Sequence, residues 1–206
     1  MAAADPRQTI VTLDLEGVLI PEIWIAVAER TGIDALRRTT RDEPDYDVLM
    51  RGRLAILDRH GLRLSDITEV IAGLAPLDGA RVFLDELRSR TQVLILSDTF
   101  EQFAHPIMGR LGWPTLFCHR LVIDDTDRIV DYRLRQPDQK RRSVEALHGL
   151  NYRVVAAGDS YNDIAMLRAA DAGVLFRAPA NVQHEFANFA AVERYDELLA
   201  LLLQQS

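Results

Sequence analysis

The stretch Ile10-Val11-Thr12-Leu13-Asp14-Leu15-Glu16-Gly17-Val18 decides the fold of this chain. Its first four residues are apolar and rich in β-branched side chains, which predicts a buried strand that ends at Asp14. Gly17 lets the backbone turn sharply just after the strand. Asp14 and Glu16 are two residues apart, so both carboxylates can face one pocket if strand pairing stops there. An Asp in this place can attack phosphorus as a nucleophile, with the second acid handling protons.

The composition limits the broad class of the protein. The chain has 206 residues, 48% of them hydrophobic, which is enough for one full core and a smaller second unit. The formal net charge is −7, whereas binding to nucleic acids or anionic membranes needs a basic face. No apolar run approaches the length of a membrane span, and residues 1–8 lack the hydrophobic stretch of a signal peptide. We therefore expect a cytoplasmic protein that binds neither nucleic acid nor membrane. Its single cysteine, Cys118, rules out an internal disulfide.

Strand-like runs alternate with amphipathic helical patterns along most of the chain. This alternation predicts an α/β fold in which helices cover both faces of a parallel sheet. The expected strands are 10–14, 92–97, 152–157 and 172–176, and the expected helices are 80–90, 100–111, 141–150 and 163–170. The runs 120–123 and 129–134 flank a polar turn and predict a β-hairpin appended to the sheet.

Residues 17–77 interrupt this alternation. The helical patterns in this segment cover residues 23–30, 46–60 and 65–74, and no strand pattern lies between them. A helical insertion directly after the first strand predicts a cap over the carboxyl edge of the sheet. We therefore expect a catalytic core of residues 1–16 and 78–206 and a cap domain of residues 17–77.

Acidic residues follow three of the predicted strands. Asp14 ends the first, Asp98 follows the second, and Asp159 comes after the strand at 152–157. A lone Asp in such a place is most often a helix cap or the start of a loop. In an open parallel sheet, however, the carboxyl ends of the strands share one ligand crevice, so the three together predict a common site.

Two further features favour phosphate chemistry. Asp159 and Asp163 are four residues apart and share a face if a helix begins there, a spacing of oxygen ligands that suits Mg²⁺. The alternative is a capped helix start. Lys140, near the start of a predicted helix, can neutralise a phosphoryl group held against carboxylates, although alone it would be a surface charge. Ser97 and Thr99 can bind phosphate oxygens through their hydroxyls or serve only as caps.

The order of these residues resembles the four motifs of the haloacid dehalogenase superfamily. The matching motifs are Asp14-x-Glu16-Gly17-Val18, Ser97-Asp98-Thr99, Lys140, and Gly158-Asp159-x-x-Asn162-Asp163. Within the superfamily the chain resembles the phosphoserine phosphatases, and more closely the bifunctional phosphoserine phosphatase/homoserine phosphotransferase branch. The segments that carry this closer resemblance are 21–24, 45–50 and 97–100. The resemblance runs from Thr9 to the C-terminal helix.

The resemblance implies a doubly wound, Rossmann-like parallel sheet with a small helical-bundle cap. It implies that Asp14 is the nucleophile and forms an aspartyl-phosphate, and that Glu16 is the acid and base. Phosphate binding is implied for Ser97, Asp98, Thr99 and Lys140, with Lys140 also counted as catalytic. Mg²⁺ is implied at the carboxylates of Asp14 and Asp159 and the backbone carbonyl of Glu16, and Asp163 and Asn162 support this metal site.

Glu16 departs from the family pattern, because most phosphatases of this superfamily have Asp there. Glu is one methylene longer, so its carboxyl group must fold back to reach the same oxygen. This departure puts the efficiency of plain hydrolysis in question and fits an intermediate that an alcohol can intercept instead of water, as in the homoserine branch.

The expected substrate is a small phosphorylated amino acid. The resemblance places Glu22 against its ammonium group and Arg53 against its carboxylate, a pairing that can be bidentate. Tyr46, Met50 and Asn162 are expected to complete the substrate pocket. The alternative for Tyr46 and Met50 is that they simply pack the cap. The alternative for Arg53 is an exposed helix residue paired with a neighbouring Asp.

Two competing functions remain open at this stage. One is a phosphatase for another small metabolite, such as phosphoethanolamine or a sugar phosphate, for which Arg53 would matter little. The other is a signalling receiver that stores phosphate on Asp14, although a cap over the site argues against it. The oligomeric state also stays open, with a homodimer as one candidate.

Overall fold

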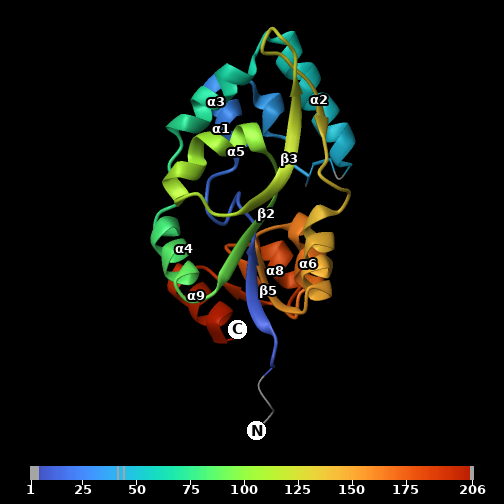
Figure 1. Ribbon diagram of the computed structural model, residues 1–206. Coiled ribbons are helices and arrows are strands. Elements are labelled where there is room, and N and C mark those ends of the chain that lie inside the picture. Colours follow the sequence, from blue (N-terminus) through green and yellow to red (C-terminus); the bar gives the residue numbers. More distant parts are fainter. Residues whose placement is uncertain (1–4, 41, 44, 205–206) are drawn as a thin grey trace.

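The computed structural model describes residues 5–40, 42–43 and 45–204, which fold around one seven-stranded sheet (Figure 1). The strand order is β4-β3-β2-β1-β5-β6-β7. The strands are β1 (Gln8–Leu13), β2 (Gln92–Phe100), β3 (Leu116–Ile123), β4 (Ile129–Arg133), β5 (Tyr152–Gly158), β6 (Ala172–Phe176) and β7 (Ala190–Val192). All neighbouring pairs are parallel except β3 and β4, which are antiparallel. The predicted α/β class and the predicted hairpin are confirmed.

Helices cover both faces of this sheet. They are α1 (Ile23–Thr31), α2 (Tyr46–Arg59), α3 (Leu64–Gly73), α4 (Ala80–Arg88), α5 (Glu101–Met108), α6 (Gln139–Gly149), α7 (Ile164–Ala169), α8 (Ala180–Glu185) and α9 (Tyr195–Gln204), with short 3₁₀ turns η1 (Asp34–Arg37), η2 (Gly109–Leu111) and η3 (Tyr161–Asp163). Helices α4 and α9 lie against one face of the sheet, and α6, α7 and α8 lie on the other (Figure 1). None of the described helices is long and apolar enough to cross a bilayer.

Alternating side chains on the strands build two hydrophobic cores. On β5, Val154 and Ala156 join the core beneath α6 and α7, whereas Val155 and Ala157 join the core beneath α4 and α9. All four side chains are fully buried. A strand buried on both faces reads as a continuous apolar run, which is why this strand was recognisable in the sequence. The core that contains Val155 and Ala157 continues into the helices inserted after β1.

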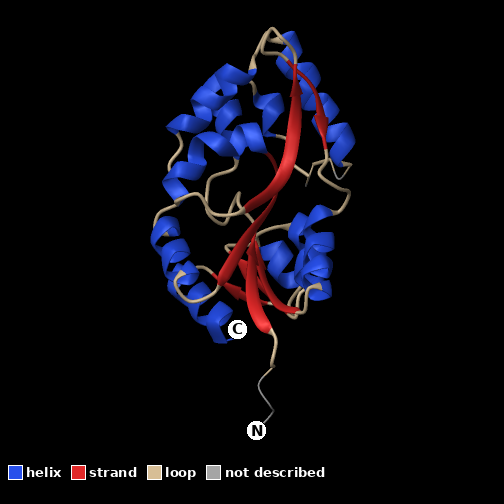
Figure 2. Cartoon of the chain, viewed as in Figure 1, coloured by secondary structure: helices blue, strands red, loops and turns tan. Residues whose placement is uncertain are grey.

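The insertion between β1 and α4 is helical and contains α1, η1, α2 and α3. Its two ends meet where the Leu77 N–H donates to the Leu19 carbonyl at 2.9 Å. The β3–β4 hairpin extends beside α2 (Figure 2). Arg51 of α2 pairs with Asp131 of β4 at 2.7 Å, so the inserted helices are tied to the hairpin as well as to the sheet. The division into a core and a cap domain stays a prediction.

The structure differs from the sequence prediction along β2. This strand was expected to end at Ser97, but it continues to Phe100. Its pairing with β3 shifts register between Leu96 and Phe100, and Phe100 pairs with His119. The register shift places Ser97, Asp98 and Thr99 in an irregular part of the strand. Helix α8 and the three-residue strand β7 were not predicted, since both are too short to produce a periodic pattern.

Candidate active site

A cavity of about 370 Å³ opens at the carboxyl ends of β1, β2 and β5, beneath the inserted helices. The sequence-predicted residues that line it are Asp14, Glu16, Glu22, Tyr46, Arg53, Ser97, Asp98, Thr99, Lys140, Asp159 and Asn162. Every expected site residue except Asp163 and Met50 thus reaches one cavity. The arrangement follows from the topology, since parallel strands bring their carboxyl ends to one edge.

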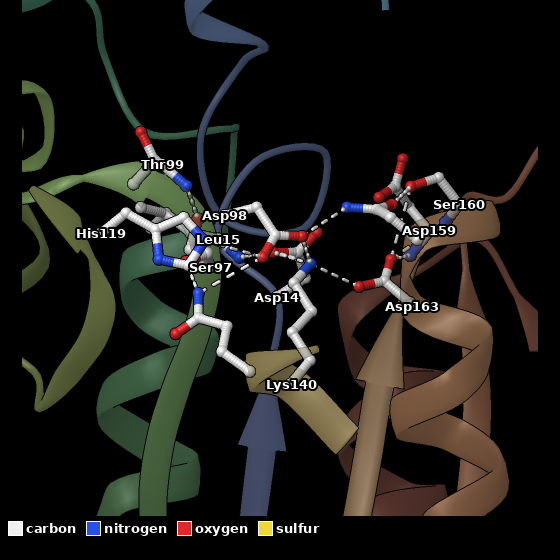
Figure 3. Close-up of polar contacts among 12 residues, drawn as sticks. Asp14, Leu15, Ser97, Asp98, Thr99, His119, Lys140, Asp159, Ser160 and Asp163 are labelled. Atoms are coloured by element: carbon white, nitrogen blue, oxygen red, sulfur yellow. Dashed lines mark hydrogen bonds and ion pairs between the residues drawn. The ribbon is translucent and has the colours of Figure 1, made fainter. Parts of the chain in front are cut away.

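Asp14 and Lys140 form the centre of this cavity (Figure 3). The Lys140 ammonium lies 2.9 Å from Asp14 Oδ1, 2.7 Å from Asp163 Oδ1 and 3.8 Å from Asp98 Oδ2. Burial and the charge of Asp163 raise the pKa of Asp14, whereas Lys140 opposes that rise. Burial works against the charge on Lys140, but the surrounding carboxylates hold its pKa well above the usual value. Lys140 therefore remains a cation beside Asp14.

The carboxylates of Asp14, Asp159 and Asp163 form a buried cluster in which one oxygen from each lies within 4.8 Å of the others. A Cβ atom on Gly17 would lie 2.5 Å from Asp159 Oδ2, and one on Gly158 would lie 2.3 Å from Asp163 Cγ. Both glycines are therefore needed for the acids to approach so closely. Burial and Asp163 raise the pKa of Asp159 to about 7, a sign of uncompensated negative charge. Clustered carboxylate oxygens of this kind fit Mg²⁺.

Glu16 is half-buried at the start of the inserted helices. Its Oε2 atom accepts a hydrogen bond of 2.8 Å from the N–H of Ile23, the first residue of α1. Burial and the neighbouring charge of Glu22 raise the pKa of Glu16 to about 7. A carboxyl group with this pKa can both donate and accept a proton near neutral pH, which suits general acid–base catalysis.

The Ser97–Thr99 segment is held from two sides. Ser97 is buried, and its Oγ accepts a hydrogen bond from the Thr99 N–H at 3.2 Å. The Gln139 side chain, also buried, donates to the Ser97 carbonyl and, at 3.3 Å, to Asp98 Oδ1. The sequence analysis missed Gln139, although it directly precedes Lys140 at the start of α6 and so was bound to lie near the site.

Arg53 is buried in the cavity wall. It is 7% exposed, its Nη2 donates to the Arg38 carbonyl at 2.7 Å, and its guanidinium carbon lies 4.5 Å from the centre of the Trp24 ring. Its Nε is buried without a hydrogen-bond partner among the described residues. The alternative of an exposed Arg53 paired with a neighbouring Asp is wrong, because neither the burial nor these contacts agree with it.

Tyr46 and Met50, both on α2, lie in different surroundings. Tyr46 joins the insertion to the sheet, since its hydroxyl donates to the Asp98 carbonyl at 2.8 Å. Met50 was expected in the substrate pocket, but it is fully buried and lies behind Arg53, with its Sδ 3.7 Å from Nη1. Helical periodicity places Met50 one turn before Arg53 but does not reveal which of the two reaches the cavity.

The haloacid dehalogenase-like hydrolase family matches residues 9–171, well over half of the chain. The chain belongs to this family. It is 64% identical over 197 residues to the phosphoserine phosphatase ThrH of Pseudomonas aeruginosa, covering 96% of both proteins. It is also 64% identical over 189 residues to a phosphoserine phosphatase of Pseudomonas syringae pv. tomato, covering 92% of this chain and 80% of that protein. The predicted family is thus confirmed.

Solved structures confirm the fold. A phospho-aspartyl intermediate analogue of phosphoserine phosphatase superposes with a TM-score of 0.79 at 21% identity, covering 95% of this chain and 99% of the other. A substrate-bound phosphoserine phosphatase complex gives a TM-score of 0.78 at 20% identity, covering 95% and 98%. The family fold therefore extends over nearly the whole chain, including the helical insertion.

The acidic cluster predicts an unusual pH dependence of stability in the metal-free protein. The raised pKa values of Glu16 and Asp159 mean that the folded protein binds protons between about pH 4 and pH 7 that the unfolded chain releases. The free energy of unfolding should fall as pH rises through this window, by about 1.4 kcal/mol per group for each unit of pKa shift. We expect the melting temperature in EDTA to be lower at pH 8 than at pH 5.5.

Mg²⁺ should reverse this trend at pH 8, because a cation bound to the folded protein replaces the missing protons and stabilises it. Thermal melts with and without EDTA measure both effects. A Glu16→Gln variant should show a weaker pH dependence, since one of the titrating groups is gone. A metal-free wild type whose melting temperature rises steadily from pH 5.5 to pH 8 would contradict the argument.

Proposed function

We propose that the chain is a Mg²⁺-dependent phosphoserine phosphatase that works through an aspartyl-phosphate on Asp14. One observation carries the proposal: Asp14, Lys140 and Asp159 share a single cavity with the buried cation Arg53 and the acid Glu22, and Asp163 lies beside Asp14 and Asp159. The part of this cavity around Asp14 and Lys140 can bind a phosphoryl group. Arg53 and Glu22 can bind the carboxylate and ammonium groups of an amino acid. The relatives at 64% identity, which carry the name phosphoserine phosphatase, support it.

In the first half-reaction, Lys140 and Ser97 hold the phosphoryl group against Asp14. The Asp14 carboxylate attacks phosphorus and forms the acyl phosphate, while Glu16 gives a proton to the departing serine oxygen. The raised pKa of Glu16, about 7, keeps a protonated fraction available for this step. Asp14, Asp159, Asp163 and the Glu16 carbonyl would hold Mg²⁺, which would supply the positive charge that lets a carboxylate approach a phosphate dianion.

In the second half-reaction, Glu16 is ionised and takes a proton from water as the water attacks phosphorus. The bond between phosphorus and the Asp14 oxygen breaks, which releases inorganic phosphate and regenerates the carboxylate. An alcohol in place of water would receive the phosphoryl group instead, so we propose homoserine as an alternative acceptor. The longer Glu side chain at position 16 is the feature of this chain that motivates the second acceptor.

The substrate's amino acid part would contact the inserted helices. Arg53 would pair with the carboxylate, since its Nε is buried with no hydrogen-bond partner in the part of the chain that the structure describes, and a bidentate ion pair would satisfy it. Glu22 would receive the ammonium group. Tyr46 and Asn162 line the same cavity and would limit its width. A cytoplasmic location and a homodimer remain predictions.

The test is phosphate release from L-phosphoserine with Mg²⁺, with and without homoserine. We expect release of phosphate, and with homoserine present we expect part of the phosphoryl group to appear as phosphohomoserine. If phosphoserine is inert while phosphoethanolamine or a sugar phosphate turns over, the catalytic assignment survives and the substrate assignment is wrong. If no phosphomonoester turns over, the proposed function is wrong altogether.

Replacing Arg53 with Met should affect phosphoserine selectively. The variant keeps most of the buried volume but removes the cation, so KM for phosphoserine should rise by roughly 10²-fold, as expected for a lost buried ion pair. Turnover of phosphoethanolamine, which has no carboxylate, should change little. Arg51→Met is the matched control, because Arg51 lies on the same helix but is exposed and pairs with Asp131. Equal losses on both substrates would show that Arg53 supports the fold and does not recognise the carboxylate.

A further inference from the structure

Asp98 lines the cavity but takes no part in either of the two half-reactions. Its carboxylate accepts hydrogen bonds of 3.3 Å from Gln139 and from Asn162, and it lies 3.8 Å from Lys140. Burial opposes its ionisation, but Lys140 and the surrounding donors hold its pKa far below the usual range. A carboxylate that stays ionised repels a phosphate dianion, so the Asp98 side chain is poorly suited to bind phosphate directly.

His119 approaches Asp98 from β3. The imidazole is 4% exposed, and its Nε2 lies 3.6 Å from Asp98 Oδ1 (Figure 3). Its Nδ1 accepts a hydrogen bond of 3.1 Å from the backbone N–H of Arg135. An imidazole nitrogen that accepts a hydrogen bond carries no proton, so the ring proton of neutral His119 is on Nε2, which faces Asp98. The ring also packs edge-on against Tyr46, with centroids 6.1 Å apart.

The ammonium group of Lys140 must stay in position while one of its N–H donors remains available to bind a phosphoryl oxygen. An ammonium group has three N–H donors, and Asp14 and Asp163 lie within hydrogen-bond distance of it. Asp98, at 3.8 Å, attracts the ammonium through its charge but is too far away to take the third hydrogen. The third donor therefore stays available for a phosphoryl oxygen, while Asp98 keeps the ammonium from moving closer to the other two acids.

We propose that His119 is a positioning residue of the phosphatase reaction: it fixes Asp98, and Asp98 in turn fixes the ammonium of Lys140. This proposal rests on the proposed function only in that Lys140 must contact the phosphoryl group. It does not depend on which alcohol carries the phosphate. His119 itself does not line the cavity that contains Asp14.

Two experiments can test the role of His119: a conservative substitution by Gln, and rescue of His119→Ala by added imidazole. In His119→Gln, the amide oxygen can accept from the Arg135 N–H and the amide nitrogen can face Asp98, so most of the positioning should survive. His119→Ala removes both contacts. A second cavity of about 350 Å³ is lined by His119, Asp98, Gln139 and Lys140, so added imidazole can reach the vacated position. His148→Ala is the control, since His148 pairs with Asp171 away from the cavity.

We expect kcat of His119→Ala to fall about tenfold, the effect of one lost interaction with a charged group, while KM stays within about twofold. His119→Gln should retain most of kcat. Imidazole should restore several-fold activity to His119→Ala but not to the wild type or His148→Ala. Melting temperatures measured alongside separate a folding defect from a catalytic one. If His119→Ala does not fold, His119→Phe keeps the ring packing without the nitrogens and should show the same loss of kcat.

The proposal is overturned if His119→Ala or His119→Phe keeps kcat within twofold of the wild type. It is also overturned if His119→Gln loses as much as His119→Ala with no rescue by imidazole, because that pattern indicates a packing role only. These kinetics are measured on whichever phosphomonoester the wild type hydrolyses, p-nitrophenyl phosphate included. Failure of the phosphoserine assignment would therefore leave this test intact, whereas an inactive wild type would refute the proposed function itself.

Discussion

Replacing Asp14 with Asn should abolish phosphatase activity, with a loss of kcat of about 10⁴-fold or more, as for nucleophile removal in other covalent enzymes. The amide nitrogen or oxygen of Asn cannot form a stable acyl phosphate, and the substitution also removes one anion of the acidic cluster. The fold should survive, because Asn has the same shape and its amide oxygen can still accept from the Leu15 N–H, which now donates to Asp14 at 2.7 Å.

Covalent labelling of the wild type and of Asp14→Asn tests this prediction. Acid-quenched wild type incubated with labelled phosphoserine should carry label that hydroxylamine removes, the behaviour of an acyl phosphate, and Asp14→Asn should carry none. Asp196→Asn is the matched control, since Asp196 is exposed and pairs with Arg194 on the surface. If Asp14→Asn remained within tenfold of the wild type, water would have to attack phosphorus directly and the covalent mechanism would be wrong.

The catalytic residues could be predicted from the sequence because the topology does most of the positioning. Once β1 and β5 were recognisable as buried parallel strands, Asp14 and Asp159 had to meet at their carboxyl ends. Gly17 and Gly158 are part of the motifs that contain these acids, so the sequence also points to them. In the structure both glycines lie against acids of the cluster and leave no room for a Cβ atom. Motif and topology therefore point to one edge of the sheet without any tertiary information.

The supporting residues could not be found in this way. His119 reaches Asp98 because β2 shifts register before Phe100, and no sequence pattern in β2 indicates such a shift. Met50 and Arg53 lie one turn apart on α2, and only the packing of the helix decides that Met50 is covered and that Arg53 lines the cavity. Sequence periodicity identifies the face of a helix that is buried, but not the group on that face that meets a ligand.

Replacing Glu16 with Gln should lower kcat for phosphoserine by about 10²- to 10⁴-fold, the range for loss of a general acid–base group. Gln can still accept from the Ile23 N–H, so the start of α1 should keep its place. It cannot protonate the serine oxygen, a poor leaving group, and it cannot activate water. Glu16→Asp is the control: it keeps a carboxyl group one methylene shorter and should retain far more activity than Glu16→Gln.

The leaving group separates the two roles of Glu16. The p-nitrophenolate ion leaves without a proton, so Glu16→Gln should still form the aspartyl-phosphate from p-nitrophenyl phosphate. Its hydrolysis, which needs the base, should then be slow. Rapid-mixing experiments should therefore show a burst of about one nitrophenol per enzyme in Glu16→Gln, followed by slow turnover, together with the hydroxylamine-sensitive label on Asp14. A variant that is slow on both substrates with no burst would show that Glu16 acts in forming the intermediate by some means other than proton transfer, because loss of its proton alone cannot slow the departure of nitrophenolate.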